Sequence, residues 1–359
     1  TTACRPVDAK DCQKELEKAL STLLKEGAGS IILDIRDNPG GLLDQSFAVS
    51  NLFLKKGQMV VSTKGRLRRD ESSYLAEGES PYREVPLVVL VSKHSASASE
   101  IVAGAIQDHD RGLIVGETTF GKGLVQTIMP LRSSRGYALA LTTARYYTPS
   151  GRLIQRDYGA TSLDDYYSPP KPRRSCDEVG SDAKLTDAGR KVYGGDGITP
   201  DYCIGPTTPS KFMAYLMARQ AFIGFSRGFV PADTNGKADI AGTGSRPDAT
   251  IGKVKAIGLD FKVDDGVLAD FRTYLDSRKL KYTEEDLGSN REALVREITE
   301  EVVKQAFGEG AARRRSLAWD PQFQRALEVA PKAEQLLRDP QRFVAEQEAS
   351  KRLAAGSQR

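Results

Sequence analysis

The sequence has 359 residues, which is long for one ordinary small domain and predicts two structural regions. Hydrophobic residues make up 39% and charged residues 28%, a balance typical of a globular protein with a core. A net charge of +4 does not indicate nucleic-acid binding, and no run approaches the roughly 18 apolar residues of a membrane helix. Two histidines, and four cysteines without CxxC spacing, predict no zinc site, and no cofactor is expected.

The first part of the chain alternates predicted helices and strands. Residues 64–84 are polar and are expected to form a loop. Around this loop, hydrophobic periodicity predicts helices over 10–25, 43–54 and 100–107, and strands over 30–35, 59–63 and 87–91.

After residue 112 the pattern first becomes rich in strands and then turns helical. Three strands are predicted over 113–115, 124–129 and 137–147, followed by an extended loop over 151–200. Residues 232–250 are predicted to be a flexible linker. Helices are predicted over 211–225, 267–277, 290–307 and 320–329. We therefore expect an α/β domain over 1–206 and a mainly helical region over 207–359.

Two turns between a strand and a helix are candidates for chemistry. The first contains Gly40 and Gly41, whose backbone N–H groups could bind an anion at a helix N-terminus, although a tight turn also needs glycine. The second holds Ser95, Ser97 and Ser99 between the strand over 87–91 and the next helix. Such a turn can expose a nucleophilic hydroxyl, but Ser99 also suits the role of helix cap.

A serine nucleophile needs a base, and the sequence offers few. His94 and His109 remain alternatives. Lys122 lies between two glycines at the start of an apolar strand, where a solvated lysine needs no such neighbours. Burial there would lower the pKa of Lys122 from about 10.4 toward 7–8, the range of a general base.

Five sequence blocks together resemble the carboxyl-terminal processing peptidases, also called tail-specific proteases, of family S41. They follow the order of the family and occupy residues 34–41, 95–101, 116–123, 142–152 and 197–201. The resemblance implies a serine endopeptidase with Ser97 as nucleophile and Lys122 as base. It also implies that Gln126 orients Lys122, and that the backbone N–H groups of Ala98 and Gly41 form the oxyanion hole.

The resemblance further implies the fold and the setting of the protein. The expected fold is a ClpP/crotonase-like α/β core with mixed β-sheets, followed by a mainly helical C-terminal region. Expected partners are protein or peptide substrates. The C-terminal helices are the expected interface of a homo-oligomer. The expected location is extracytoplasmic, in the periplasm or cell envelope of a bacterium. Arg36 and Glu117 are interpreted as structural ion-pair residues.

The chain also departs from the pattern of the family. Relatives carry a PDZ domain before the core, and residues 1–29 are too short to hold one, which predicts either a truncated chain or a lost domain. Two other functions remain open: a non-catalytic protein that binds hydrophobic ligands or peptides on the same fold, and a crotonase-like acyl-CoA enzyme. Cys176 and Cys203 flank the long loop and are predicted to form a disulfide.

Overall fold

The computed structural model describes residues 12–131, 136–156, 182–231 and 255–356. These residues divide into two compact units. The helical unit is Pro206–Gln324, and the α/β unit comprises the described residues up to Gly205 together with those from Arg325 onward. The candidate serine and lysine both lie in the α/β unit.

A parallel sheet forms the centre of the α/β unit. Its strands are β1 (Ile31–Asp34), β4 (Leu87–Val91), β5 (Leu113–Gly116) and β10 (Tyr202–Cys203), in the order β1-β4-β5-β10. All five residues of β4 are buried, as a continuous apolar run in the middle of a parallel sheet predicts. Because β1 and β4 are adjacent and parallel, the segments that follow them leave the same edge of the sheet.

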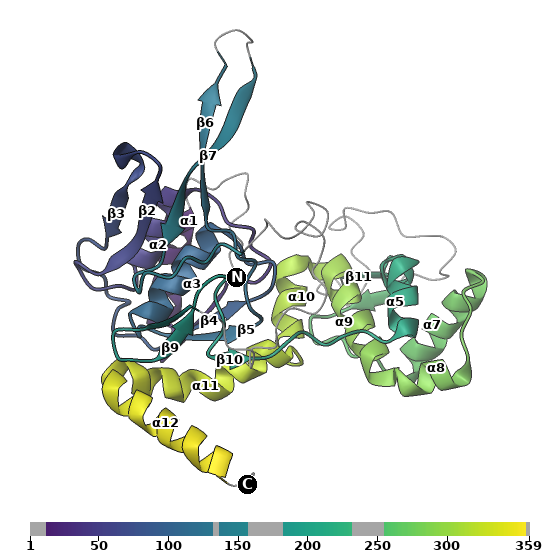
Figure 1. The fold of residues 1–359 in the computed structure, drawn as a ribbon. Coiled ribbons are helices and arrows are strands. Elements are labelled where there is room, and N and C mark those ends of the chain that lie inside the picture. The colour runs from purple at the N-terminus through teal and green to yellow at the C-terminus, as the bar shows by residue number, and fades with distance from the viewer. Residues whose placement is uncertain (1–11, 132–135, 157–181, 232–254, 357–359) are drawn as a thin grey trace. The chain divides into compact units, whose positions relative to one another are not determined.

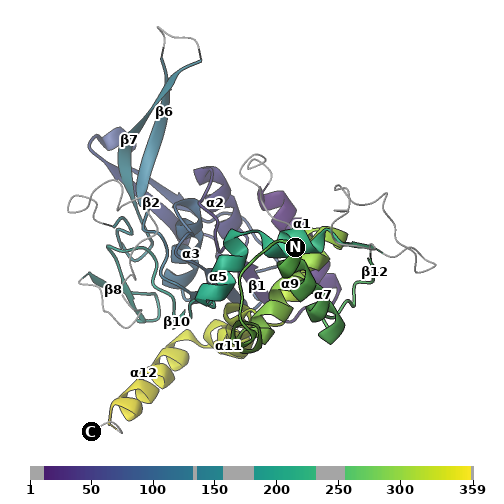
Figure 2. The same ribbon diagram turned by 90° about the vertical axis from the view of Figure 1, so that its right-hand side faces the viewer.

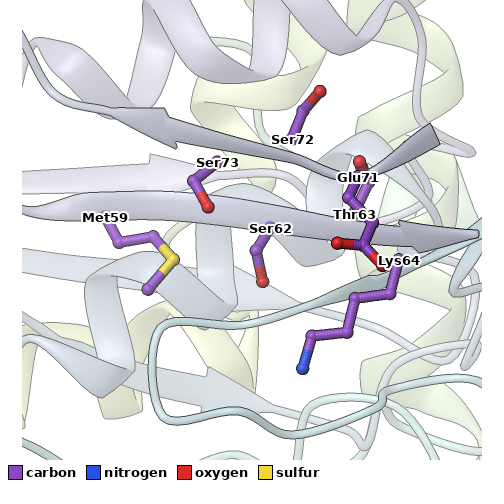
Figure 3. A pocket seen from close by; sticks show the side chains of 7 residues that line it. All are labelled: Met59, Ser62, Thr63, Lys64, Glu71, Ser72 and Ser73. Carbon is purple, nitrogen blue, oxygen red and sulfur yellow. The ribbon is translucent and has the colours of Figure 1, made fainter. Parts of the chain in front are cut away.

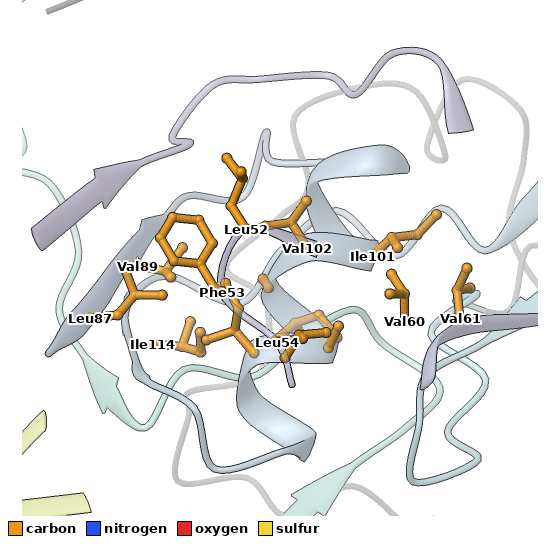
Figure 4. Close-up of a cluster of buried hydrophobic side chains, with 14 of the residues drawn as sticks. Leu52, Phe53, Leu54, Val60, Val61, Leu87, Val89, Ile101, Val102 and Ile114 are labelled. Carbon is orange, nitrogen blue, oxygen red and sulfur yellow. The ribbon is translucent and has the colours of Figure 1, made fainter. Parts of the chain in front are cut away.

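Three helices of this unit are α1 (Cys12–Lys25), α2 (Leu43–Asn51) and α3 (Ala98–Asp108). Every residue of α3 from Ser99 to Asp108 is buried. The apolar side chains of α3 share one cluster with the central strands and with the segment after α2 (Figure 4). The labelled members of this core are Leu52, Phe53, Leu54, Val60, Val61, Leu87, Val89, Ile101, Val102 and Ile114.

An antiparallel sheet is the second layer of strands in this unit. Its order is β3-β2-β7-β6, with β2 at Met59–Gly65, β3 at Ser72–Leu75, β6 at Leu124–Pro130 and β7 at Ala138–Tyr147. The prediction of a loop over 64–84 was wrong in part, because β3 and a short 3₁₀ helix (Arg68–Asp70) lie there. Most β3 side chains are exposed, so β3 shows no apolar alternation, and its pairing with β2 defines it. In both views, β6 and β7 project from this unit as a two-stranded ribbon (Figures 1 and 2).

Buried charges hold the segment after β7 to the core. The predicted loop over 151–200 contains the hairpin β8 (Ala183–Leu185) and β9 (Lys191–Tyr193). Fully buried Arg152 forms an ion pair with Asp108 of α3. Arg190 bridges two further carboxylates, Asp110 and Asp201. A buried charge is stable only when paired, so these pairs fix Arg152 and the β8–β9 hairpin against α3 and the residues that follow it.

Two C-terminal helices, α11 (Pro321–Arg338) and α12 (Pro340–Gly356), follow the helical unit. From Arg325 onward they are grouped with the α/β unit. Tyr202 of β10 accepts a hydrogen bond from Gln347 at 2.8 Å, and the charged groups of Arg325 and Lys332 lie over its ring.

The helical unit is built on an aromatic core that includes Phe222, Phe225 and Phe271. The predicted helix over 211–225 is broken in two at Gln220, which adopts a left-handed conformation with φ of 52°. The predicted linker over 232–250 lies outside the described residues. The elements are α5 (Lys211–Ala218), α6 (Ala221–Ser226), α7 (Asp265–Ser277), α8 (Glu284–Ser289), α9 (Arg291–Phe307), α10 (Glu309–Ser316) and a parallel pair, β11 (Phe229–Pro231) with β12 (Lys255–Ile257).

Cys12 and Cys203 are both disulfide-bonded. Because Cys176 lies outside the described residues, its pairing with Cys203 stays a prediction. Within the described ranges, no helix is long and apolar enough to cross a membrane.

Candidate active site

The turn between β4 and α3 holds Ser97 in a strained backbone conformation. Ser97 has φ of 56° and ψ of −114°, a region that residues other than glycine rarely occupy. The next residue begins α3, so Ser97, and not Ser99, directly precedes the helix. A strained serine between a strand and a helix N-terminus is the geometry of a nucleophile elbow.

The hydroxyl groups of the three serines have different surroundings. Ser95 donates to the carbonyl of Ile35 at 2.8 Å, and Ser99 donates to the carbonyl of Asn38 at 3.1 Å. Ser95 and Ser99 therefore fasten the turn to the segment that follows β1. Ser97 is half-buried, and its Oγ donates no hydrogen bond to a described residue, although it takes part as an acceptor in a capping box with the backbone N–H of Glu100. Of the three hydroxyls, only that of Ser97 keeps its proton free of an acceptor within the described structure.

Gly40 brings the segment after β1 into direct contact with this turn. A Cβ atom at Gly40 would lie 2.7 Å from the carbonyl oxygen of Ala96, 2.9 Å from the nitrogen of Ala98 and 2.9 Å from Cβ of Ser97. Gly40 also has φ of 100°. Both facts require glycine, so the two turns identified in the sequence meet at this residue.

Two backbone N–H groups beside the turn have no acceptor within the described part of the chain. They belong to Ala98, the first residue of α3, and to Gly41. The N–H of Gly40, by contrast, donates to the side chain of Asn38 at 2.9 Å. Ala98 and Gly41 are the residues predicted to bind an oxyanion, and their N–H groups are available for that purpose.

Glu100 links the serine turn to the loop that carries Lys122. Its side chain is fully buried, and Oε2 accepts from the N–H groups of Ser97 and Lys122, both at 2.8 Å. Oε1 accepts from the hydroxyl of Thr119 at 2.6 Å and from the N–H of Gly121 at 2.7 Å. Burial raises the pKa of the Glu100 carboxyl, and the hydrogen bonds that it accepts act in the opposite direction.

The sequence analysis did not identify the role of Glu100, which lies in the first turn of a helix where acidic residues are common. A signal was nevertheless present. Residues 101–106 of this helix are apolar or small throughout, which is typical of a buried helix. A carboxylate on such a helix must find hydrogen-bond donors, and here two of them come from a loop 19 and 21 residues away in sequence.

Lys122 lies in the loop just before β6 and is half-buried. Its carbonyl accepts a hydrogen bond from the hydroxyl of Tyr146. Within the described residues, no hydrogen bond joins the side chain of Lys122 to Ser97. Catalytic hydrogen bonds often tighten only in the substrate complex. Gln126 is exposed at an irregularity of β6, and the described structure records no hydrogen bond between its side chain and Lys122.

The two histidines and Arg36 have hydrogen-bond or ion-pair partners. Both ring nitrogens of His109 are engaged, by Asp187 and by the carbonyl of Met59, each at 2.7 Å. His94 is exposed, and its Nδ1 lies 3.0 Å from Asp37. Arg36 forms an ion pair, with Asp34 at 2.8 Å.

Glu117 was also predicted to form an ion pair, and this prediction was wrong: Glu117 forms none with the residues that the structure describes. Its N–H donates to the carbonyl of Val91, so its backbone contributes to the edge of the parallel sheet.

A shallow pocket of about 330 Å³ lies elsewhere, on β2 and β3 (Figure 3). None of the predicted site residues lines it. The residues that line the pocket are Met59, Ser62, Thr63, Lys64, Glu71, Ser72 and Ser73.

The described residues contain no group of three or more histidine, cysteine or acidic side chains that could hold a metal ion.

The region that contains Ser97 and Lys122 is similar to known proteins. Residues 8–162 match the sequence profile of Peptidase family S41. A carboxy-terminal-processing protease of Bartonella bacilliformis is 49% identical over 145 residues. This part of the chain belongs to peptidase family S41. A chloroplastic C-terminal processing peptidase of Tetradesmus obliquus is 42% identical to this chain over 170 residues.

The alignments with the S41 proteins are partial. They cover 40% and 46% of this chain, and the chain spans about a third of each of these two relatives (33% and 36%). Among solved structures, a photosystem II D1 C-terminal processing protease aligns with a TM-score of 0.40 and 31% identity, over 55% of this chain and 40% of that chain.

Proposed function

We propose that this chain is a serine endopeptidase of the C-terminal processing type, with Ser97 as nucleophile and Lys122 as general base. The observation that carries the proposal is the state of Ser97. Ser97 combines a strained φ of 56° with a hydroxyl proton that no described residue accepts, while the hydroxyls of Ser95 and Ser99 both donate hydrogen bonds. Strain of this kind persists where the surrounding structure maintains it, and it is common at active sites.

The first half of the reaction would form an acyl-enzyme. The neutral amine of Lys122 accepts the proton of Ser97 Oγ as Oγ bonds to the carbonyl carbon of the substrate. The carbonyl oxygen becomes an oxyanion, which accepts hydrogen bonds from the N–H groups of Ala98 and Gly41. Each such donor contributes about 3–4 kcal/mol in the transition state. The C–N bond then breaks, and Lys122 returns the proton to the leaving amine.

In the second half, a water molecule attacks the ester that joins the acyl group to Ser97. Lys122 accepts a proton from this water as the new C–O bond forms. The ester C–O bond then breaks, Ser97 Oγ regains the proton, and the carboxylic acid product leaves. Glu100 acts as a positioning residue in both halves, because one of its oxygens binds the backbone N–H groups of Ser97 and Lys122 together.

The location of the protein is also part of this proposal. Disulfide bonds at Cys12 and Cys203 favour an oxidising compartment outside the cytoplasm, such as the bacterial periplasm or cell envelope.

A fluorophosphonate probe, which reacts with activated serines, tests the proposal directly. We expect mass spectrometry to place the label on Ser97 and on neither Ser95 nor Ser99. Labelling should disappear in Ser97→Ala and persist in Ser99→Ala, the matched control from the same turn. A folded protein that binds hydrophobic peptides but never labels at Ser97 would instead be a non-catalytic binding protein on this fold.

A further inference from the structure

The ribbon of β6 and β7 has one apolar, exposed face. Thr127 pairs with Leu141 and Met129 pairs with Leu139, so these four side chains share a face. Leu131 donates its N–H to the carbonyl of Tyr137, which extends the same face by one pair. Five large side chains on this apolar face are between 41% and 71% exposed: Met129, Leu131, Tyr137, Leu139 and Leu141.

Most of the ribbon is uncharged, although Arg145 lies near the end of β7. Residues 124–131 and 137–144 contain no aspartate, glutamate, lysine or arginine. Exposed sheet surfaces in stable monomers usually carry charged side chains that prevent association. A neutral, apolar face of this size is therefore a binding surface for an equally neutral, apolar partner.

Among the residues that the structure describes, β6 is the outermost strand of its sheet, so one row of its backbone groups has no strand partner there. In an antiparallel ladder, successive residues direct their N–H and C=O groups alternately toward the paired strand and away from it. The hydrogen bond from Leu131 to Tyr137 shows that Leu131 directs its N–H toward β7. By that alternation, the nitrogen atoms of Ile128 and Pro130 face the open edge. Ile128 offers a donor there, and Pro130 offers none. The edge is thus closed to pairing at its far end and open in the half that begins at Leu124.

The open half of the edge lies next to the candidate base. Lys122 is two residues before Leu124, the first residue of β6. The start of the ribbon is held in place, because Tyr146 of β7 donates its N–H to the carbonyl of Gly123 at 3.0 Å, and Gly123 donates to Gln155 at 2.8 Å. A strand added to this edge would extend from the ribbon toward Lys122.

We propose that the open edge of β6 and the apolar face bind an extended, uncharged apolar segment of the polypeptide substrate by strand addition. The backbone of β6 supplies hydrogen bonds in its open half, and the apolar face, which begins there at Leu141 and continues past Pro130 toward Leu131 and Tyr137, accepts apolar side chains of the segment. A substrate fits better than a second copy of the chain, because Pro130 blocks the half of the edge that is farther from Lys122 and leaves open the half beside it. This inference rests on the proposed peptidase function, since it assigns part of the substrate site.

Two pairs of variants test the edge and the face separately. Ile128→Pro removes the open donor without removing a ladder bond, and Ile128→Gln keeps that donor and is its control. Leu139→Gln with Leu141→Gln makes the apolar face polar. Ala138→Gln with Ala140→Gln places the same side chains on the opposite face and is the matched control.

Binding is measured in a Ser97→Ala background, so that no turnover is required. The probe is a fluorescein-labelled, uncharged peptide with leucine at alternate positions, followed by fluorescence anisotropy. We expect the Kd to rise at least about tenfold in Ile128→Pro and in the Leu139/Leu141 variant, and to change less than about threefold in both controls. A peptide with aspartate in place of each leucine should bind at least about tenfold more weakly.

Two results would overturn the inference: unchanged peptide affinity in both test variants, or a dimer in light scattering that the Leu139/Leu141 variant abolishes. Circular dichroism establishes that each variant is folded, and a variant that unfolds is replaced by Leu139→Gln alone. The proposed function is judged separately, by fluorophosphonate labelling of the chain with intact Ser97. Loss of labelling with retained peptide binding would refute the peptidase mechanism and leave the ribbon site in place.

Discussion

Gly40→Ala should separate the contribution of the oxyanion hole from the rest of the site. The added Cβ would lie 2.7 Å from the carbonyl oxygen of Ala96 and 2.9 Å from the nitrogen of Ala98. Both atoms belong to the backbone and cannot rotate away. The segment after β1 must therefore move away from the turn, and the N–H of Gly41 moves with it.

Two separate effects of Gly40→Ala set the expected losses in the free energy of unfolding and in kcat/KM. Alanine at φ of 100° adds backbone strain of about 1–3 kcal/mol, which should lower the free energy of unfolding by a similar amount. The clash shifts one oxyanion donor relative to the other by about half an ångström or more, and a misplacement of about 1 Å can cost a hundredfold in rate. Loss of one donor costs about 10²–10³ in kcat. We expect kcat/KM to fall by about 10²–10³.

Gly29→Ala is the matched control, because nothing lies within 4 Å of a Cβ at Gly29, its φ is not positive, and Gly29 precedes β1 rather than following it. This variant should retain kcat/KM within about threefold. The assay is hydrolysis of a short chromogenic ester, with thermal unfolding measured on the same samples. A folded Gly40→Ala enzyme with more than about a tenth of wild-type kcat/KM would refute the packing argument, as would an equal loss in both variants.

Four further predictions concern the base, the buried carboxylate, the cysteines and the substrate terminus. Lys122→Arg should be as inactive as Ser97→Ala, because arginine stays protonated near neutral pH; retention of more than about a tenth of kcat/KM would remove lysine as the base. In Glu100→Gln, the amide N–H groups would face N–H donors of the protein, which leaves donors without acceptors. The free energy of unfolding should therefore fall by about 2–3 kcal/mol, and kcat should fall as well. An unchanged melting temperature and an unchanged kcat would contradict this expectation. Cys176 and Cys203 should resist a thiol label in the folded, unreduced protein, and labelling of both would exclude their pairing. Amidation of a substrate's C-terminus should leave the kcat/KM of this chain nearly unchanged, because the proposed reaction involves only the groups of the peptide bond that is cleaved; a hundredfold loss, about 2.7 kcal/mol, would show that the core reads the terminus.

Sequence patterns predicted the elements whose side chains are buried on a regular period. The strand predicted over 87–91 is β4, with all five residues buried, and the helix predicted over 100–107 lies within α3. Patterns failed where pairing or one unusual residue defines the structure. The exposed strand β3 is held by its neighbour β2, and the left-handed Gln220 divides one predicted helix into α5 and α6.

The sequence by itself determined the family and the residue types of the candidate site, because these depend on short contiguous motifs around Ser97 and Lys122. Only the tertiary structure decided how the motifs meet. The packing of Gly40 against Ala96, and the hydrogen bonds that Glu100 accepts from Thr119, Gly121 and Lys122, join segments that are far apart in the chain. Local sequence cannot specify such contacts, because a hydrogen-bond donor or a clash at this distance exists only after β1 and β4 have paired.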